Sequence, residues 1–151
     1  MGDGDRFYMG VALQEADQAY LLGEVPIGAV VVRNQEVIGR GHNMRETWKD
    51  PTAHAEIIAI KEACRRVGGW RLTESTLYVT IEPCPMCAGA IVLARLPRLV
   101  YGARDPKGGA VDSLFDLVRR EELNHRVEGA AGILGEECRA IIQKFFRELR
   151  S

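Results

Sequence analysis

One histidine, one glutamate and two cysteines stand at a spacing that suits metal-dependent hydrolysis. His54 precedes Glu56 by two positions, Cys84 follows 28 positions later (84 − 56 = 28), and Cys87 comes three after Cys84. Imidazole nitrogen and thiolate sulfur are common zinc ligands, and three of them leave the fourth tetrahedral position open for water. Such a site, with an uncommitted carboxylate beside it, predicts a hydrolytic zinc centre in which Glu56 carries protons.

Two other interpretations compete with a catalytic zinc: a structural zinc closed by four protein ligands, and a chance motif that binds no metal. Structural sites usually draw their ligands from paired motifs. None of the spare candidates forms a second CxxC or HxxxH pair with the first set. The spare candidates are Cys64, Cys138, His42 and His125. The sequence therefore favours an open site, and Cys64 and Cys138 are predicted to be core residues on helical apolar stripes.

Length and composition predict a single domain over residues 1–151. A chain of 151 residues with 46% hydrophobic residues is large enough to bury a core. It has no apolar run of about 18 residues and no basic, apolar leader, so we expect a cytoplasmic protein without a membrane partner. In a reducing compartment Cys84 and Cys87 would be thiolates rather than a disulfide. The net charge of −1 neither predicts nor excludes nucleic-acid binding.

Hydrophobic periodicity and turn residues predict alternating helices and strands. Helices are expected over 5–22, from Asp50-Pro51 to Gly68-Gly69, from Cys84 to about 95, over 114–118, and from about 135, where Cys138, Ile141, Ile142, Phe145 and Leu149 form the buried stripe. Strands are expected over 25–32 and 37–41 as an antiparallel hairpin, over 76–81 and 99–103 as parallel neighbours, and around 125–128 at an edge. The predicted fold is a three-layer α/β/α sandwich with a mixed five-stranded sheet.

This arrangement can bring the four chemical residues together. Cys84 and Cys87 are three positions apart at the start of one helix, so both can reach the same ion. His54 lies near the start of another helix. If both helices leave the same edge of the sheet, where open α/β sheets usually place their sites, their N-termini converge on the metal. A helix N-terminus also lowers the pKa of a thiol, which favours the metal-binding thiolate.

The whole chain resembles the bacterial tRNA adenosine deaminases, members of the cytidine deaminase-like group of zinc enzymes. The HxE and PCxxC pattern is the general signature of zinc-dependent nucleobase deaminases, and other segments narrow the resemblance. They are 24–29 (EVPIGA), 50–56 (DPTAHAE), 77–80 (LYVT), 82–90 (EPCPMCAGA), 102–109 (GARDPKGG), 124–127 (NHRV) and the Phe145-Phe146 tail.

The resemblance implies hydrolytic deamination of adenosine to inosine at the wobble position of a tRNA anticodon. It implies one Zn²⁺ per subunit held by His54, Cys84 and Cys87, with Glu56 as the proton shuttle of a zinc-bound hydroxide. It assigns a base contact to Asn43, a pocket wall to Ile27, and contacts with the anticodon stem-loop to Asp105, Lys107, Asn124, His125 and Phe146. It also implies a homodimer in which RNA contacts both subunits. Without the resemblance, Asn43 would be interpreted as a turn residue and Phe146 as core.

Two alternative functions remain open from the sequence. A guanine, cytosine or cytidine deaminase acting on a free base or nucleoside would use the same zinc chemistry without an RNA groove. A zinc-stabilised RNA-binding or partner subunit would have the fold without catalysis.

Overall fold

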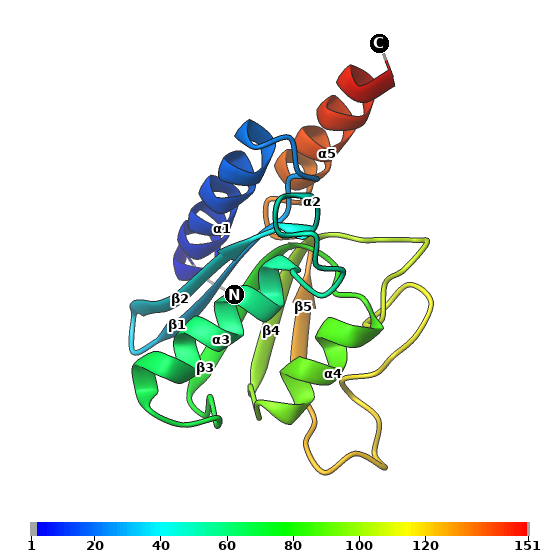
Figure 1. Ribbon diagram of the computed structural model, residues 1–151. Coiled ribbons are helices and arrows are strands. Elements are labelled where there is room, and N and C mark those ends of the chain that lie inside the picture. Colours follow the sequence, from blue (N-terminus) through cyan, green and yellow to red (C-terminus); the bar gives the residue numbers. More distant parts are fainter. Residues whose placement is uncertain (1–2, 151) are drawn as a thin grey trace.

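The centre of the fold is a mixed five-stranded sheet, seen in a computed structural model that describes residues 3–150 (Figure 1). The strands are β1 (Gly28–Arg33), β2 (Glu36–His42), β3 (Ser75–Ile81), β4 (Arg98–Ala103) and β5 (Glu128–Ala131), in the order β2-β1-β3-β4-β5. β1 is antiparallel to β2 and β3, whereas β3, β4 and β5 are parallel. The predicted hairpin and the predicted parallel pair are both confirmed.

Helices cover both faces of the sheet (Figure 1). The first face carries α1 (Asp3–Leu21) and α5 (Gly135–Arg150), and the second carries α3 (Ala55–Val67) and α4 (Pro85–Leu93). The four-residue helix α2 (Arg45–Trp48) links β2 to α3. The helices on both faces of the sheet confirm the predicted three-layer α/β/α sandwich. Between residues 3 and 150, no helix combines the length and the apolar character that a bilayer crossing requires.

Side-chain alternation along the strands divides the core into two layers. In β1, Ala29 and Val31 pack in the cluster under α3 and α4, whereas Val30 and Val32 pack in the cluster under α1 and α5. This follows from the two-residue period of a strand, which sends successive side chains to opposite faces. A sheet buried on both faces needs the continuous apolar run that the sequence shows here.

On the second face of the sheet, α3 lies very close to β2. A Cβ at Gly41 would lie 2.8 Å from the backbone nitrogen of Ala59, and closer still to the carbonyl oxygen of Ala55, the first residue of α3. Gly39 faces α3 one turn further along, beside Ala59 and Ala63. The two glycines therefore let α3 lie directly on the strand, which fixes the position of its N-terminus.

Two local predictions before the site are wrong. The helix predicted to start at Asp50-Pro51 starts later, because α3 begins at Ala55 with His54 as its N-cap. Asp50 Oδ1 instead accepts hydrogen bonds from the backbone nitrogen of Thr52 at 2.8 Å and from its hydroxyl at 2.7 Å. The side chain of Asp50 therefore stabilises a separate turn at residues 50–52, because the backbone N–H and the hydroxyl of Thr52 are nearer than the N-terminus of α3. The hairpin strand also begins at Gly28 rather than at residue 25.

Two predictions after β4 are also wrong in position or type. Residues 114–118 form an irregular loop with bends at Leu114 and Val118 instead of a helix. The backbone nitrogens of Leu114 and Phe115 both donate to the carbonyl oxygen of Gly109. The loop therefore turns back toward Gly109 instead of continuing as a helix. The edge strand is present, but as β5 at Glu128–Ala131, about three residues later than predicted.

The last helix carries less core than its stripe predicts. Cys138 is fully buried, but Leu149 is 68% exposed. The C-terminal end of α5 extends past the edge of the sheet (Figure 1). There it packs beside the end of α1, with the rings of Tyr20 and Phe145 6.3 Å apart and a hydrogen bond from the Tyr20 hydroxyl to Glu148.

The close approach of α3 and β2 gives a first test. We expect Gly41→Ala to lower the free energy of unfolding by about 1–3 kcal/mol, because the added methyl group must push α3 away from β2. Chemical denaturation measures the change. Gly10→Ala in α1 is the control, because a Cβ there meets nothing within 4 Å. It should leave stability unchanged or raise it by up to about 1 kcal/mol, and equal stability of both variants would contradict the packing argument.

Candidate metal centre

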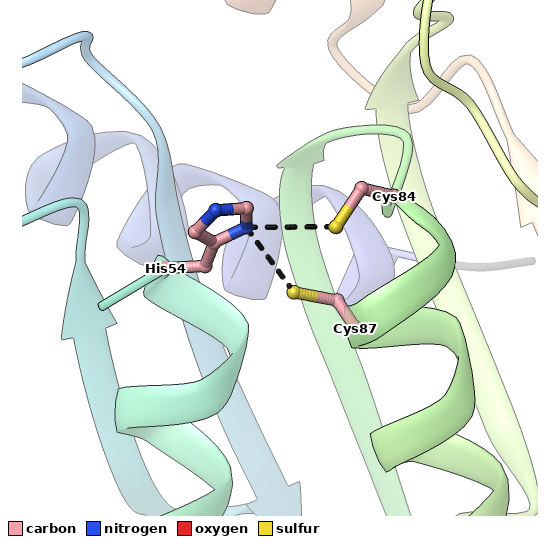
Figure 2. A group of neighbouring side chains, drawn as sticks. All are labelled: His54, Cys84 and Cys87. Carbon is pink, nitrogen blue, oxygen red and sulfur yellow. Dashed lines mark hydrogen bonds between the residues drawn. The ribbon is translucent and has the colours of Figure 1, made fainter. Parts of the chain in front are cut away.

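The structure brings His54, Cys84 and Cys87 together at the edge of the sheet (Figure 2). His54 Nδ1 lies 3.6 Å from the sulfur of Cys84 and 3.5 Å from the sulfur of Cys87. A nitrogen and a sulfur bound to one tetrahedral zinc at about 2.1 and 2.3 Å are about 3.6 Å apart. The spacing of the three ligand atoms therefore fits zinc.

Two helix N-termini supply these side chains. His54 is the N-cap of α3, Cys84 is the N-cap of α4, and Cys87 lies in the first turn of α4, on the same side as Cys84 (Figure 2). α4 follows β3 after a short turn, and Pro85 occupies its first position, where no backbone hydrogen bond is lost. The helix dipoles place partial positive charge at the site, which favours thiolates.

Charge states within the trio suit a divalent cation. The hydrogen bond from the Cys87 thiol lowers the pKa of Cys84 to about 4, despite the opposing effect of burial, and the bond to His54 adds to the lowering. The same Cys87–Cys84 bond, together with burial, raises the pKa of Cys87. Without a metal, these shifts favour a Cys84 thiolate that accepts a hydrogen bond from the Cys87 thiol. A divalent ion would stabilise both as thiolates, so the chemistry of the donor set fits zinc.

No fourth protein ligand joins the trio within residues 3–150. The other candidates are engaged elsewhere. His42 contacts Glu15 at 2.8 Å, His125 contacts the carbonyl oxygen of Leu96 at 2.6 Å, and Cys64 faces the carbonyl oxygen of Trp70. Cys138 is buried in the first-face core, as predicted, whereas Cys64 is only partly buried.

Glu56 lies beside the trio in the first turn of α3. Only 3% of it is exposed, and burial raises its pKa to about 7. It lines a cavity of about 270 Å³ together with His54 and Cys84. A carboxyl group with a pKa near neutrality can both accept and donate protons.

Three of the predicted substrate residues line the same cavity: Ile27, Asn43 and Asp105. Asn43 is 4% exposed, and its side chain is held by hydrogen bonds. Its Oδ1 accepts from the backbone nitrogen of Arg45, and its Nδ2 donates to the carbonyl oxygen of Val25 at 3.4 Å. Asn43 therefore shapes the turn after β2 and also faces the cavity.

A second, larger hollow of about 910 Å³ adjoins the first, and both are lined by Ile27, Arg45, Ile81 and Asp105. Lys107 and Phe146, two further predicted contacts, line this hollow together with Arg147 and Arg150. Phe146 is 38% exposed, so it is not a simple core residue.

Asn124 and His125 are not brought to either cavity. The hydrogen bond between His125 and Leu96 holds the histidine just before β4 begins. The trio lies beyond the opposite end of the parallel strands, after β3 has ended. Asn124 is exposed in the same distant loop.

Sequence reasoning missed two buried glutamates that fix backbone segments near the site. Glu24 is 1% exposed and accepts hydrogen bonds from the backbone nitrogens of Glu46 and Thr47, which fixes α2. Glu82 is 2% exposed and lines the cavity. Burial alone would raise the pKa of Glu82, but hydrogen bonds from Ser113 and from loop backbone nitrogens bring it to about 2. The available signal was a carboxylate directly after a buried strand.

Comparison with known proteins identifies similar chains. The family model described as MafB19-like deaminase matches residues 4–150. The tRNA-specific adenosine deaminase of Bacillus subtilis strain 168 is 54% identical over 146 residues, covering 97% of this chain and 91% of that protein. A solved structure from a study of A-to-I editing by tRNA:A34 deaminases at the wobble position of transfer RNA has a TM-score of 0.86 and 46% identity, covering 89% and 98% of the two chains. A guanine deaminase structure from Bacillus subtilis has a TM-score of 0.63 and 39% identity, covering 69% and 66%.

Proposed function

Because the chain belongs to the MafB19-like deaminases and to the tRNA-specific adenosine deaminases among them, we propose that it hydrolyses adenosine to inosine at the wobble position of a tRNA anticodon. The observation that carries this proposal is the meeting of His54, Cys84, Cys87 and Glu56 at one cavity. The overall reaction adds one water and releases one ammonia.

His54 Nδ1 and the sulfurs of Cys84 and Cys87 would hold one zinc ion in each subunit. Bound there, zinc supplies the Lewis acidity that brings the pKa of water to about 7. The cavity leaves the side of the trio that faces Glu56 free of other protein ligands among residues 3–150.

Glu56 is proposed to carry the protons. Its buried carboxylate accepts a proton from the attacking water and delivers it to N1 of the adenine ring. It then passes the second proton to the leaving amino group at C6, which departs as ammonia. The pKa of about 7 that burial gives this side chain supports both directions of transfer.

Asn43 and Ile27 are proposed to hold the adenine. The side chain of Asn43 uses Oδ1 and one N–H for its own turn, which leaves one N–H for the base. Ile27 gives an apolar wall beside it. A base can enter such a cavity only after leaving its stack, which costs least in a loop where it is already unpaired.

The second hollow is proposed to bind the rest of the anticodon loop. Lys107, Arg147 and Arg150 can pair with phosphates, and the ring of Phe146 can stack on a base. Asp105 stands between the two hollows and would contact the nucleotide next to the flipped one. This cationic hollow supports an RNA substrate over a free base.

We further propose a homodimer in the cytoplasm. Four large apolar side chains are exposed along α4 and the loop that packs beside it, and a second subunit would cover them: Met86, Leu93, Leu114 and Phe115. An RNA bound across two subunits could reach Asn124 and His125 on one while its wobble base occupies the cavity of the other. Thiol ligands and a tRNA substrate both suit the cytoplasm.

The substrate assignment is tested by a competition of substrates. We expect the zinc-loaded protein to form inosine in an anticodon stem-loop with adenosine at the wobble position, and to leave free guanine, cytosine and cytidine unchanged. Nuclease digestion and chromatography measure the products. Conversion of a free base without conversion of the stem-loop would instead support the guanine or cytosine deaminase alternative.

Glu56→Ala tests the proton path. We expect deamination to fall by at least about a hundredfold, while zinc content and the thermal unfolding midpoint stay near those of the unchanged protein. Glu62→Ala, on the exposed side of the same helix, is the matched control and should keep full activity. Full activity of Glu56→Ala would refute the mechanism.

Cys87→Ala tests the ligand set. Two remaining ligands bind zinc far more weakly than three, so we expect the purified variant to lose most of its zinc, as measured by metal analysis. Cys138→Ala, which removes a buried thiol on the other face of the sheet, should keep one zinc per subunit. An unchanged zinc content in Cys87→Ala would exclude Cys87 as a ligand.

A further inference from the structure

Glu82 is a buried carboxylate that organises a loop instead of reacting. It directly follows β3 and is 2% exposed. Its Oε1 accepts hydrogen bonds from the backbone nitrogen of Asp105 at 3.0 Å and from the hydroxyl of Ser113. Its Oε2 accepts from three consecutive backbone nitrogens, those of Val111, Asp112 and Ser113, at 3.1, 2.7 and 2.9 Å. One side chain thus holds both ends of the segment 105–113.

The segment is folded tightly around this carboxylate. A Cβ at Gly109 would lie 2.5 Å from Glu82 Oε2 and closer to its other carboxyl atoms, so only glycine fits there. The backbone nitrogen of Ala110 also donates to the carbonyl oxygen of Pro83, the residue after Glu82. The side chain of Asp112 is also held, because the hydroxyl of Tyr101 donates to its Oδ2 at 2.5 Å.

The residues that Glu82 holds in place form a wall of both hollows. Asp105 lines the metal cavity and the larger hollow, and Lys107 lines the larger one. Asp105 Oδ1 in turn accepts from the backbone nitrogens of Lys107 and Gly108. The positions of Asp105 and Lys107 therefore depend on the hydrogen bonds of Glu82.

Glu82 cannot act as a second proton carrier. A carboxylate offers about four lone-pair positions, and five donors already surround this one.

We propose that Glu82 is a positioning residue for the substrate: it holds the segment 105–113 as a preformed wall of the cavity, and so lowers KM for the RNA without taking part in the chemical step. This inference rests on the proposed function. A preformed wall matters because each residue ordered only on binding weakens affinity.

The first test is Glu82→Gln, which keeps the shape of the side chain but turns one acceptor oxygen into a donor. We expect KM for the anticodon stem-loop to rise at least about tenfold, with kcat within about twofold and zinc content unchanged. Hydrogen exchange followed by mass spectrometry should show faster exchange in the peptide that contains residues 111–113. Glu122→Gln, an exposed acid that pairs with Arg120, is the control and should change none of these quantities.

The second test is Gly109→Ala, which keeps Glu82 and pushes the segment away from it. We expect the same rise in KM, and we expect the double variant with Glu82→Gln to be little worse than either single variant, because both remove one contact. This variant keeps the test decisive if Glu82→Gln does not fold.

The outcomes separate this inference from the proposed function. A folded Glu82→Gln variant with unchanged KM, or with a lowered kcat at unchanged KM, would overturn the positioning role. Additive effects of the two substitutions would also overturn it. If the unchanged protein neither binds nor converts the stem-loop, the proposed function fails, and hydrogen exchange alone still decides whether Glu82 holds the segment.

Discussion

The placement of two helix N-termini at one edge of the sheet is the constraint on which the site depends. α4 begins there because it follows β3 after a short turn, and the parallel pairing of β3 with β4 sends it back along the sheet. α3 begins there because Gly39 and Gly41 let it lie directly against β2. Neither position is set by His54, Cys84 or Cys87 themselves. The scaffold holds these three side chains, so their donor atoms are already spaced for one ion.

The surroundings of two buried glutamates in the same cavity shift their pKa values in opposite directions. Glu56 and Glu82 are almost equally buried, at 3% and 2% exposure. Burial raises the pKa of Glu56 to about 7, whereas donors from the segment 105–113 outweigh burial at Glu82 and bring its pKa to about 2. A carboxylate that must move protons needs few fixed hydrogen bonds. A carboxylate that must hold a loop needs many, and it then stays ionised.

Most of the fold and the trio of His54, Cys84 and Cys87 could be predicted from short-range sequence patterns. The CxxC spacing, the apolar strands and the Gly68 helix end each depend on neighbouring residues only, and all are found in the structure. The errors arose where one local pattern competes with another, or where distant residues decide the conformation. Asp50 looks like a helix cap, but Thr52 uses its side chain first. Residues 114–118 have an apolar pattern, but their backbone is bonded to Gly109 and Ala110. The position of Glu82 after a buried strand marks it as unusual, but its role could not be derived from the sequence, because its donors lie more than twenty positions away.

The exposed end of α5 shows why apolar periodicity alone does not predict which part of a helix is buried. Periodicity predicts that Leu149 is buried with Cys138, yet the helix leaves the sheet after its first turns, and Leu149 is 68% exposed. Tyr20 contacts Phe145 and Glu148 where α5 passes the end of α1. These contacts hold the end of α5 beside the edge of the sheet where His54, Cys84 and Cys87 lie, without a core beneath it. That position places Phe146 and Arg147 over the larger hollow. An amphipathic helix that continues past its sheet can therefore form a wall for a ligand, and in this chain its apolar and basic residues both line the larger hollow, where we propose that the anticodon loop binds.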